Sequence, residues 1–242
     1  MYNYYFRDYA IHTRILAYAK GDVNGDRITD NVYLIGMKAS TSPFVENTAL
    51  VIQDGKSGRF IRVSLNQNSG YDAKLFLKDF TGDGVNEILI GIDSGDRDAT
   101  TYDYIYSFIN NIPKLLFDFE KYNNEYKYNV NFKDNHKVEF ISEKNNQKYI
   151  INISSKGIDY LNKVYNKNGK LKKITKGFVN PLSGLYTMDF DSDGICEVLA
   201  YQKILGRSSV DTLGYVLNTL KWKKDKFYLA NQNVSIFGVE NK

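Results

Sequence analysis

The sequence predicts an all-β protein, a β-propeller of about four blades in which each blade is a four-stranded antiparallel sheet. Composition gives the first indication, because only three Pro accompany 18 Gly, 20 Tyr and 14 Phe in 242 residues. Such a composition favours strands and tight turns over helices. An internal repeat gives the second indication, since an acidic loop that runs directly into an apolar strand occurs three times.

The repeat is visible in GDVNGDRITDNVYLIG, KDFTGDGVNEILIG and MDFDSDGICEVLAYQ. The acids that close the three loops are Asp30, Glu87 and Glu197, which are 57 and 110 residues apart. Because the second spacing is close to twice a blade of roughly 55 residues, we expect a degenerate copy between them. The segment NFKDNHKVEFIS, 131–142, fits this copy and has Glu139 in the closing place.

Each unit is expected to contain a strand that enters the loop, a strand that leaves it, and two more. The units are approximately 15–70, 71–122, 123–184 and 185–237 of a single domain spanning 1–242, and 1–14 is a candidate closing latch. The least regular region is 158–184, where an excursion or short helix is expected. The expected strands are 15–19, 31–36, 49–53 and 60–65; 75–80, 87–92, 102–108 and 114–119; 126–132, 137–142, 148–153 and a poorly defined 171–175; and 185–190, 197–202, 214–222 and 226–234.

The loops place oxygen-bearing side chains at their first, third, fifth and ninth positions, and the carbonyl at the seventh adds another oxygen. Alternate residues of a tight loop converge on one point, and calcium takes about six to eight oxygen ligands. We therefore expect two to three bound calcium ions. The candidate ligands are Asp22, Asn24, Asp26, Ile28 and Asp30; Asp79, Thr81, Asp83, Val85 and Glu87; and Asp189, Asp191, Asp193, Ile195 and Glu197.

EF-hand loops are excluded because their twelfth position requires a bidentate Glu, where these loops have Tyr33, Ile90 and Ala200. An acid at the ninth position followed by a strand resembles the FG-GAP or VCBS repeats of integrin α-subunits and bacterial surface proteins, including VCBS-repeat proteins of spore-forming Gram-positive bacteria. The resemblance covers nearly the whole chain at the level of the repeat and implies calcium loops within propeller blades. The alternative is that the loops are simple turns whose carboxylates cap backbone N–H groups. Repulsion among the crowded carboxylates argues against that alternative.

Calcium affinity is expected to be highest in the third loop, lower in the second and lowest in the first. The third loop has four carboxylates and Gly194 at its sharp turn, whereas the second has the neutral Thr81 at its third position. The first loop has Arg27 where Gly is expected, and a left-handed conformation there costs about 1 kcal/mol. In the degenerate unit Lys133 would place an ammonium group in the cation site, so no metal is expected there.

Two further groups of residues are open to more than one interpretation. Asp93, Asp96 and Asp98 follow the second loop's strand. They either add a ligand or line a binding face, or they form a solvated turn, which is favoured. Tyr102, Tyr104 and Tyr106 alternate at period two and so line one sheet face, where they pack between blades or stack on sugars.

No catalytic group is expected. His12 and His136 lie in different units, at no spacing typical of zinc ligands or a nucleophile elbow. Cys196 is interpreted as a small buried hydrophobe. Seven lysines between 156 and 176 face a single acid, Asp159, and are interpreted as a solvated hairpin, so nucleic-acid binding is not supported.

The expected function is that of a non-catalytic, calcium-binding propeller, a monomer that serves as a binding or structural module for an unknown protein or glycan ligand. A carbohydrate-binding lectin and a calcium-dependent hydrolase are the alternatives. The N-terminal residues contain no apolar stretch of the length that a signal peptide or membrane span requires. A location on a cell or spore surface is favoured.

Overall fold

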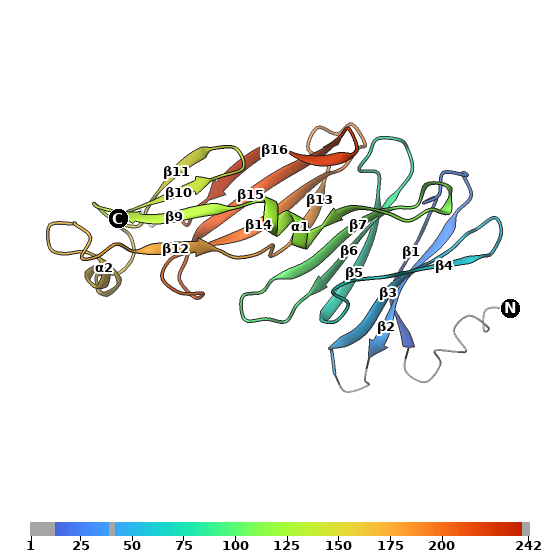
Figure 1. The fold of residues 1–242 in the computed structure, drawn as a ribbon, viewed down its shortest axis with the longest axis horizontal. Helices are drawn as coiled ribbons and strands as arrows, with labels where there is room; N and C mark the ends of the chain where they lie inside the picture. Colours follow the sequence, from blue (N-terminus) through green and yellow to red (C-terminus); the bar gives the residue numbers. More distant parts are fainter. Residues whose placement is uncertain (1–12, 39–41, 239–242) are drawn as a thin grey trace.

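The computed structural model describes residues 13–38 and 42–238, which form three antiparallel sheets (Figure 1). The first sheet is an up-and-down meander of β1 (Thr13–Gly21), β2 (Asp30–Lys38), β3 (Val45–Gln53) and β4 (Phe60–Ser64). The second is the same meander made of β5 (Tyr71–Lys78), β6 (Glu87–Asp93), β7 (Thr101–Ser107) and β8 (Lys114–Asp118). A short 3₁₀ turn, η1 (Ile109–Asn111), joins β7 to β8.

The third sheet has the strand order β11-β10-β9-β12-β14-β15-β16. β12 pairs with the end of β14, at Ile204 and Leu205, and β13 pairs with the start of β14, at residues 197–200. It curves until its outer strands approach each other, and the Tyr149 hydroxyl donates to the Gln232 carbonyl at 3.1 Å. The sheet is thus barrel-like and nearly closed. Its strands are β9 (Tyr128–Lys133), β10 (Lys137–Ser142), β11 (Gln147–Asn152), β12 (Lys176–Val179), β13 (Leu185–Met188), β14 (Glu197–Leu205), β15 (Thr212–Lys223) and β16 (Lys226–Ser235).

The four-bladed propeller predicted from the repeat is wrong. Three of the expected units do form four-stranded meanders, β1–β4, β5–β8 and β13–β16. The third expected unit, 123–184, contains β9 to β12 but is not a meander, because β12 pairs with β9 on one side and with β14 on the other. Edge pairing thereby merges the last two units into one sheet, and no ring of separate blades forms. The candidate latch 1–14 lies almost entirely outside the described residues.

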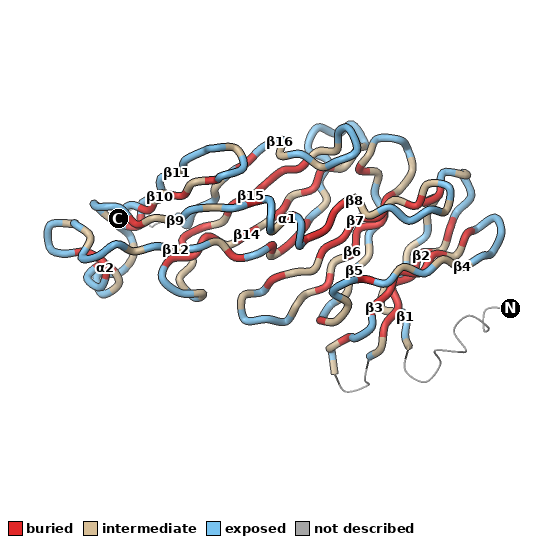
Figure 2. Tube along the Cα trace, viewed as in Figure 1, coloured by how far each residue is buried: buried red, intermediate tan, exposed pale blue. Residues whose placement is uncertain are grey.

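Buried residues follow the middle strands of each sheet (Figure 2). One apolar cluster joins the first two sheets to the start of the third and includes the fully buried Phe80 and Phe108. A second cluster fills the curved sheet. Helix α1 (Phe119–Glu125) covers one face of β7, and its Phe119 packs 5.6 Å from the Tyr104 ring and 5.1 Å from the Tyr102 ring. The alternating tyrosines of β7 thus fill the core at that face.

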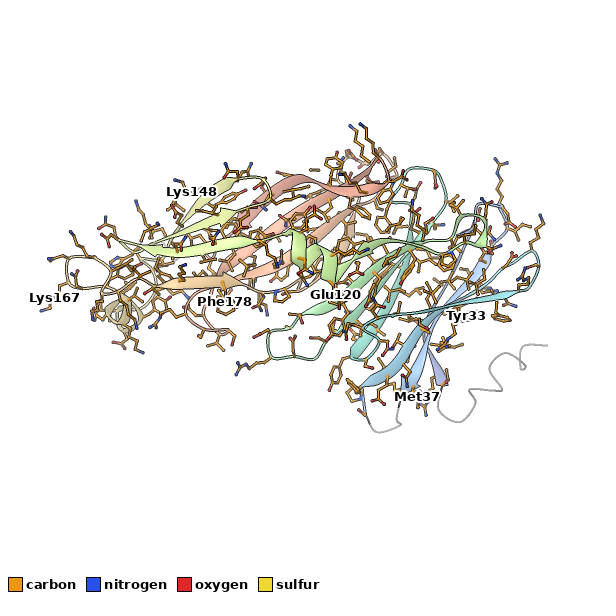
Figure 3. All side chains as sticks on the ribbon, viewed as in Figure 1. Tyr33, Met37, Glu120, Lys148, Lys167 and Phe178 are labelled. Carbon is orange, nitrogen blue, oxygen red and sulfur yellow. The ribbon has the colours of Figure 1, made fainter. Side chains whose placement is uncertain are left out.

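The lysine-rich stretch 156–176 includes helix α2 (Ile158–Val164) and a tight bridge between Tyr165 and Leu171. Most of it is exposed, and Lys167 extends from this end of the molecule (Figure 3). Lys156 is an exception, because it forms an ion pair with Asp211 at 3.0 Å. Within 13–38 and 42–238, neither α-helix has the length and apolar character needed to cross a lipid bilayer.

A buried polar network crosses the interior of the curved sheet. The hydroxyls of Tyr122 and Tyr128 each lie 3.1 Å from Gln202 Oε1, and Asn218 Nδ2 donates to the same hydroxyls at 2.7 and 2.8 Å. Asn218 Oδ1 in turn accepts from Gln232 Nε2 at 2.8 Å. Because every member has a partner, the network links α1, β9, β14, β15 and β16 without an unsatisfied buried group at these positions.

Asn218→Ala should lower the free energy of unfolding by about 2 kcal/mol, because Gln232 and the two tyrosine hydroxyls would lose a buried partner. Asn233→Ala, an exposed change on β16 next to Gln232, is the matched control and should change stability by less than about 0.5 kcal/mol. Urea unfolding measures both. Equal effects from the two variants would contradict a structural role for the network.

Candidate metal centre

The three acidic loops fold onto one hydrogen-bond frame. In each loop the closing acid is the first residue of the outgoing strand and accepts from the backbone N–H at the second loop position. These bonds run from Val23 to Asp30, from Phe80 to Glu87 and from Phe190 to Glu197, at 3.0, 2.8 and 3.0 Å. The shared frame confirms that the three segments are structurally equivalent.

The first aspartate of each loop accepts from backbone N–H groups that curl around it. The donors to Asp22 are Gly25 and Arg27, both at 2.8 Å, and the equivalent donors serve Asp79. Asp189 accepts from the fifth and sixth positions of its loop, Asp193 and Gly194. The sixth position is left-handed in every loop, with φ of 65° at Arg27, 82° at Gly84 and 86° at Gly194. Arg27 therefore adopts the strained conformation that the sequence predicted for it.

The fifth and seventh positions of each loop are also joined in one way. The N–H groups of Ile28, Val85 and Ile195 donate to the carboxylates of Asp26, Asp83 and Asp193, at 2.8, 2.9 and 2.8 Å. Each fifth-position carboxylate thus uses one oxygen, Oδ1, within the loop. Its second oxygen accepts no bond from this frame and could serve as a ligand.

The loops lie side by side in a row. Asn86 N–H in the second loop donates to the Asp22 carbonyl at 3.1 Å, and Cys196 N–H in the third donates to the Asp79 carbonyl at 2.7 Å. Gly82 is required at one of these junctions, since a Cβ there would lie 2.8 Å from the Ile195 side chain. This row connects the first sheet, the second sheet and the curved sheet at one end of their strands.

The closing acids are the buried members of the loops. Asp30, Glu87 and Glu197 are at most 3% exposed, whereas the other candidate side-chain ligands, apart from the buried Asn24, are half-buried or exposed. Burial raises the pKa of Glu87 to about 7 and also raises the pKa of Asp30. A buried carboxylate favours either a proton or a nearby cation.

In the third loop that cation is a lysine. Oxygens of Asp189, Asp191 and Glu197 lie within 4.8 Å of one another. Lys221 on β15 places its ammonium 2.8 Å from Asp191 and 2.7 Å from Glu197. The pKa of Lys221 is raised by these two acids, and the pKa of Asp191 is lowered by the lysine. Sequence reasoning missed Lys221 because it lies 24 residues beyond the loop's closing acid.

The first loop fills its centre with an amide. Asn24 Nδ2 lies 3.4 Å from acceptor oxygens of Asp30, Asp54 and Asn111. Asp54, a buried acid from the turn after β3, was not among the predicted ligands. Its pKa is lowered chiefly by a hydrogen bond from Ser57. The amide nitrogen of Asn24 thus occupies the position among these acceptors.

The second loop has neither a lysine nor an amide at its centre. Glu87 Oε1 accepts only the Thr81 hydroxyl, at 3.1 Å, among the hydrogen bonds of the described residues. Thr81, Asp83 and Glu87 line a cavity of about 380 Å³ whose other walls include Trp222 and Asp225. Of the three loops, the second therefore offers a buried carboxylate with the most accessible surroundings.

The degenerate unit contains no loop of this kind. Its strands β9 and β10 pair directly, with Lys133 opposite Lys137, through a three-residue turn. The Lys133 ammonium lies 3.0 Å from Glu139, the acid in the closing place. The two histidines remain apart: His12 lies outside the described residues, and His136 packs edge-on against Tyr165. Cys196 contacts the apolar core, and burial raises its pKa.

The second acidic group forms the turn between β6 and β7. Asp93 and Asp96 line a different cavity, of about 610 Å³, together with Asp103, which sequence reasoning missed. Asp103 is 3% exposed, and burial raises its pKa to about 7, with the negative charge of Asp93 acting in the same direction. Asp98 is not part of this lining. None of the three predicted acids joins the second loop.

Lys221→Met should lower the thermal unfolding midpoint in excess chelator, because the buried Glu197 would lose its cationic partner. Millimolar calcium should then raise the midpoint of Lys221→Met more than that of the unchanged protein, since the metal no longer competes with an ammonium group. Lys223→Met, on the same strand and exposed, is the control. An identical calcium response in both variants would exclude Lys221 from this competition.

Asp103 should make the protein less stable as the pH rises. Its folded pKa of about 7 lies above the ordinary 3.8, so the folded state holds the proton and the contribution to stability is lost between about pH 4 and about pH 7. Asp103→Asn should remove this loss. Urea unfolding across that range measures the stability of both proteins. Glu87, whose pKa is also raised, is present in both, so the difference between them reports the contribution of Asp103 alone.

Comparison with known proteins identifies relatives outside the family that the loop pattern resembles. A family model described as the YybI C-terminal domain matches residues 126–235, which span the curved sheet. The uncharacterized protein YybI of Bacillus subtilis (strain 168) is 41% identical over 235 residues, covering 97% of this chain and 90% of YybI. No solved structure matches. The FG-GAP and VCBS assignment is therefore wrong, and the chain belongs to the YybI family.

Proposed function

We propose that this chain is a non-catalytic, calcium-binding protein that serves as a binding or structural module. The observation that carries the proposal is the row of three loops with one hydrogen-bond frame and one buried closing acid each. A cation at the row would neutralise the crowded carboxylates and tie together the sheets that the loops connect.

The second loop is proposed as the principal calcium site. Its Glu87 is 1% exposed, and Glu87 Oε1 accepts only the Thr81 hydroxyl among the described residues, whereas the third loop contains Lys221 and the first contains the Asn24 amide nitrogen. A calcium ion that enters the third or the first loop would have to displace the Lys221 ammonium or the Asn24 amide, respectively. This order replaces the affinity ranking expected from the carboxylates and the sixth-position residue of each loop, because that ranking did not include Lys221 or the contacts of the Asn24 amide.

The non-catalytic part of the proposal rests on the partners of the reactive groups. The loop carboxylates are engaged by backbone N–H groups, and His136 packs on an aromatic ring rather than beside a nucleophile. A surface location belongs to the same proposal, since extracellular calcium modules commonly bind at about 10⁻⁴–10⁻³ M. Carbohydrate binding is a second candidate, favoured by the cavity of about 610 Å³ beside the second sheet.

Thermal unfolding in excess EGTA and in millimolar calcium tests the proposal. Calcium at about 100 times its Kd should stabilise the fold by about 2.7 kcal/mol, a rise in Tm of roughly 5–10 °C for a chain of this size. Asp83→Ala should remove most of this rise, while Asp193→Ala should leave most of it, because Lys221 already neutralises the third loop.

Asp225→Ala is the matched control, because Asp225 lines the same cavity as Asp83 but lies outside the acidic loop and pairs with Lys114. It should keep the full calcium response. The absence of any calcium-dependent rise, together with no calcium in the purified protein by elemental analysis, would contradict the proposal and leave the loops as turns.

A further inference from the structure

A second cavity is remote from the acidic loops. It has a volume of about 610 Å³ and lies between β5 and β6 of the second sheet and the segment that leads into β13. Its volume is in the range of small-molecule binding sites, roughly 300–1,000 Å³. None of the fifteen predicted metal ligands lines it.

Three aromatic side chains with exposed surface stand around this cavity. Tyr71, Phe76 and Tyr186 are 37%, 48% and 53% exposed. Two of the rings lie against glycine backbone: a Cβ at Gly95 would lie 2.1 Å from the Tyr71 ring, and one at Gly184 would lie 2.8 Å from Tyr186. Phe44 also packs edge-on against Tyr71, 5.2 Å away. The cavity therefore presents apolar rings that the fold holds in place.

A buried acid lies at the base of the same cavity. Asp103 is 3% exposed, and its Oδ2 accepts from the Thr101 hydroxyl at 2.5 Å. Its Oδ1 has no hydrogen-bond donor among the described residues. Gly91 makes room for this oxygen, since a Cβ there would lie 2.9 Å from it. Because Asp103 lines the cavity, this oxygen can accept a hydrogen bond from a ligand hydroxyl or from water that enters it.

The other charged side chains of the cavity already have partners within the fold. Lys74 lies 2.8 Å from Asp72 and 4.0 Å from Asp93, so one ammonium serves two acids. Both oxygens of Asp96 accept hydrogen bonds from Thr100, one from its backbone and one from its hydroxyl. An anionic ligand would be repelled by Asp93 and Asp96, and a cationic ligand would be repelled by Lys74. An uncharged ligand with hydroxyl donors avoids both costs.

We propose that this cavity binds a neutral saccharide, with sugar rings against Tyr71, Phe76 and Tyr186 and a hydroxyl donating to Asp103. A purely apolar ligand would leave Asp103 Oδ1 without a donor, whereas a sugar supplies both C–H faces for the rings and O–H groups for the acid. The inference goes beyond calcium binding and does not rest on it, because the cavity contains no loop ligand.

An array of neutral and charged oligosaccharides, probed with the full chain in calcium buffer, is the first experiment, followed by calorimetric titration with the glycan captured best. Tyr186→Ala and Phe76→Ala should each weaken that binding about tenfold, since both remove an exposed ring from the cavity wall. Asp103→Leu should weaken it at least as much. Tyr228→Ala removes a tyrosine of 38% exposure outside the cavity and should leave binding unchanged.

Binding that persists in Tyr186→Ala and Phe76→Ala, capture of charged glycans alone, or no binding at millimolar sugar would overturn the proposal. The Tm of every variant in calcium and in EGTA is measured on the same samples, so that a folding defect is recognised. A calcium-dependent rise in Tm without sugar binding would refute only the saccharide proposal. Sugar binding without that rise would refute only the calcium proposal.

Discussion

The bond from the second loop position to the closing acid is the interaction on which the rest of the structure depends. The closing acid begins β2, β6 or β14, and it stands opposite the end of the incoming strand, as in the pair Lys78–Glu87. The bond therefore fixes the conformation of the loop and the register between the strand that enters the loop and the strand that leaves it. Because the carboxylate is buried, its N–H partner compensates part of the desolvation cost, and its loss would leave an unpaired charge in the core.

One backbone frame supports three different electrostatic solutions. The first loop places an amide nitrogen of Asn24 near its acids, the third places the ammonium of Lys221 there, and the second leaves Glu87 with the Thr81 hydroxyl. The negative charges that argue for calcium from the sequence are thus already partly balanced in two loops. Charge count within a loop is a poor measure of cation affinity when neighbouring strands contribute donors.

Edge pairing decides the architecture of the C-terminal half. Four separate blades would bury sheet faces against one another, but β12 instead extends the sheet from β9 to β14. The curved sheet then encloses an interior that includes the hydrogen-bonded network around Asn218. The YybI C-terminal domain match covers this sheet, 126–235, whereas the loop row extends from the N-terminal sheet into it.

The sequence by itself determined the strands and the loops, because alternation of apolar residues and acidic turns are local properties of the chain. Nearly every strand lies close to its expected position, and β10 matches it fully. Only the tertiary structure decided how the sheets join and which side chains enter each site. Lys221, Asp54 and Asp103 reach their sites through strand pairing and turns outside the loop motif, and the pairing of β12 depends on contacts between residues far apart in the sequence. Loop spacing carries no record of such contacts. The sequence therefore predicted a ring of blades with calcium sites ranked by the residues of each loop, whereas the protein has no ring of blades and its loops differ in the side chains that reach them from elsewhere.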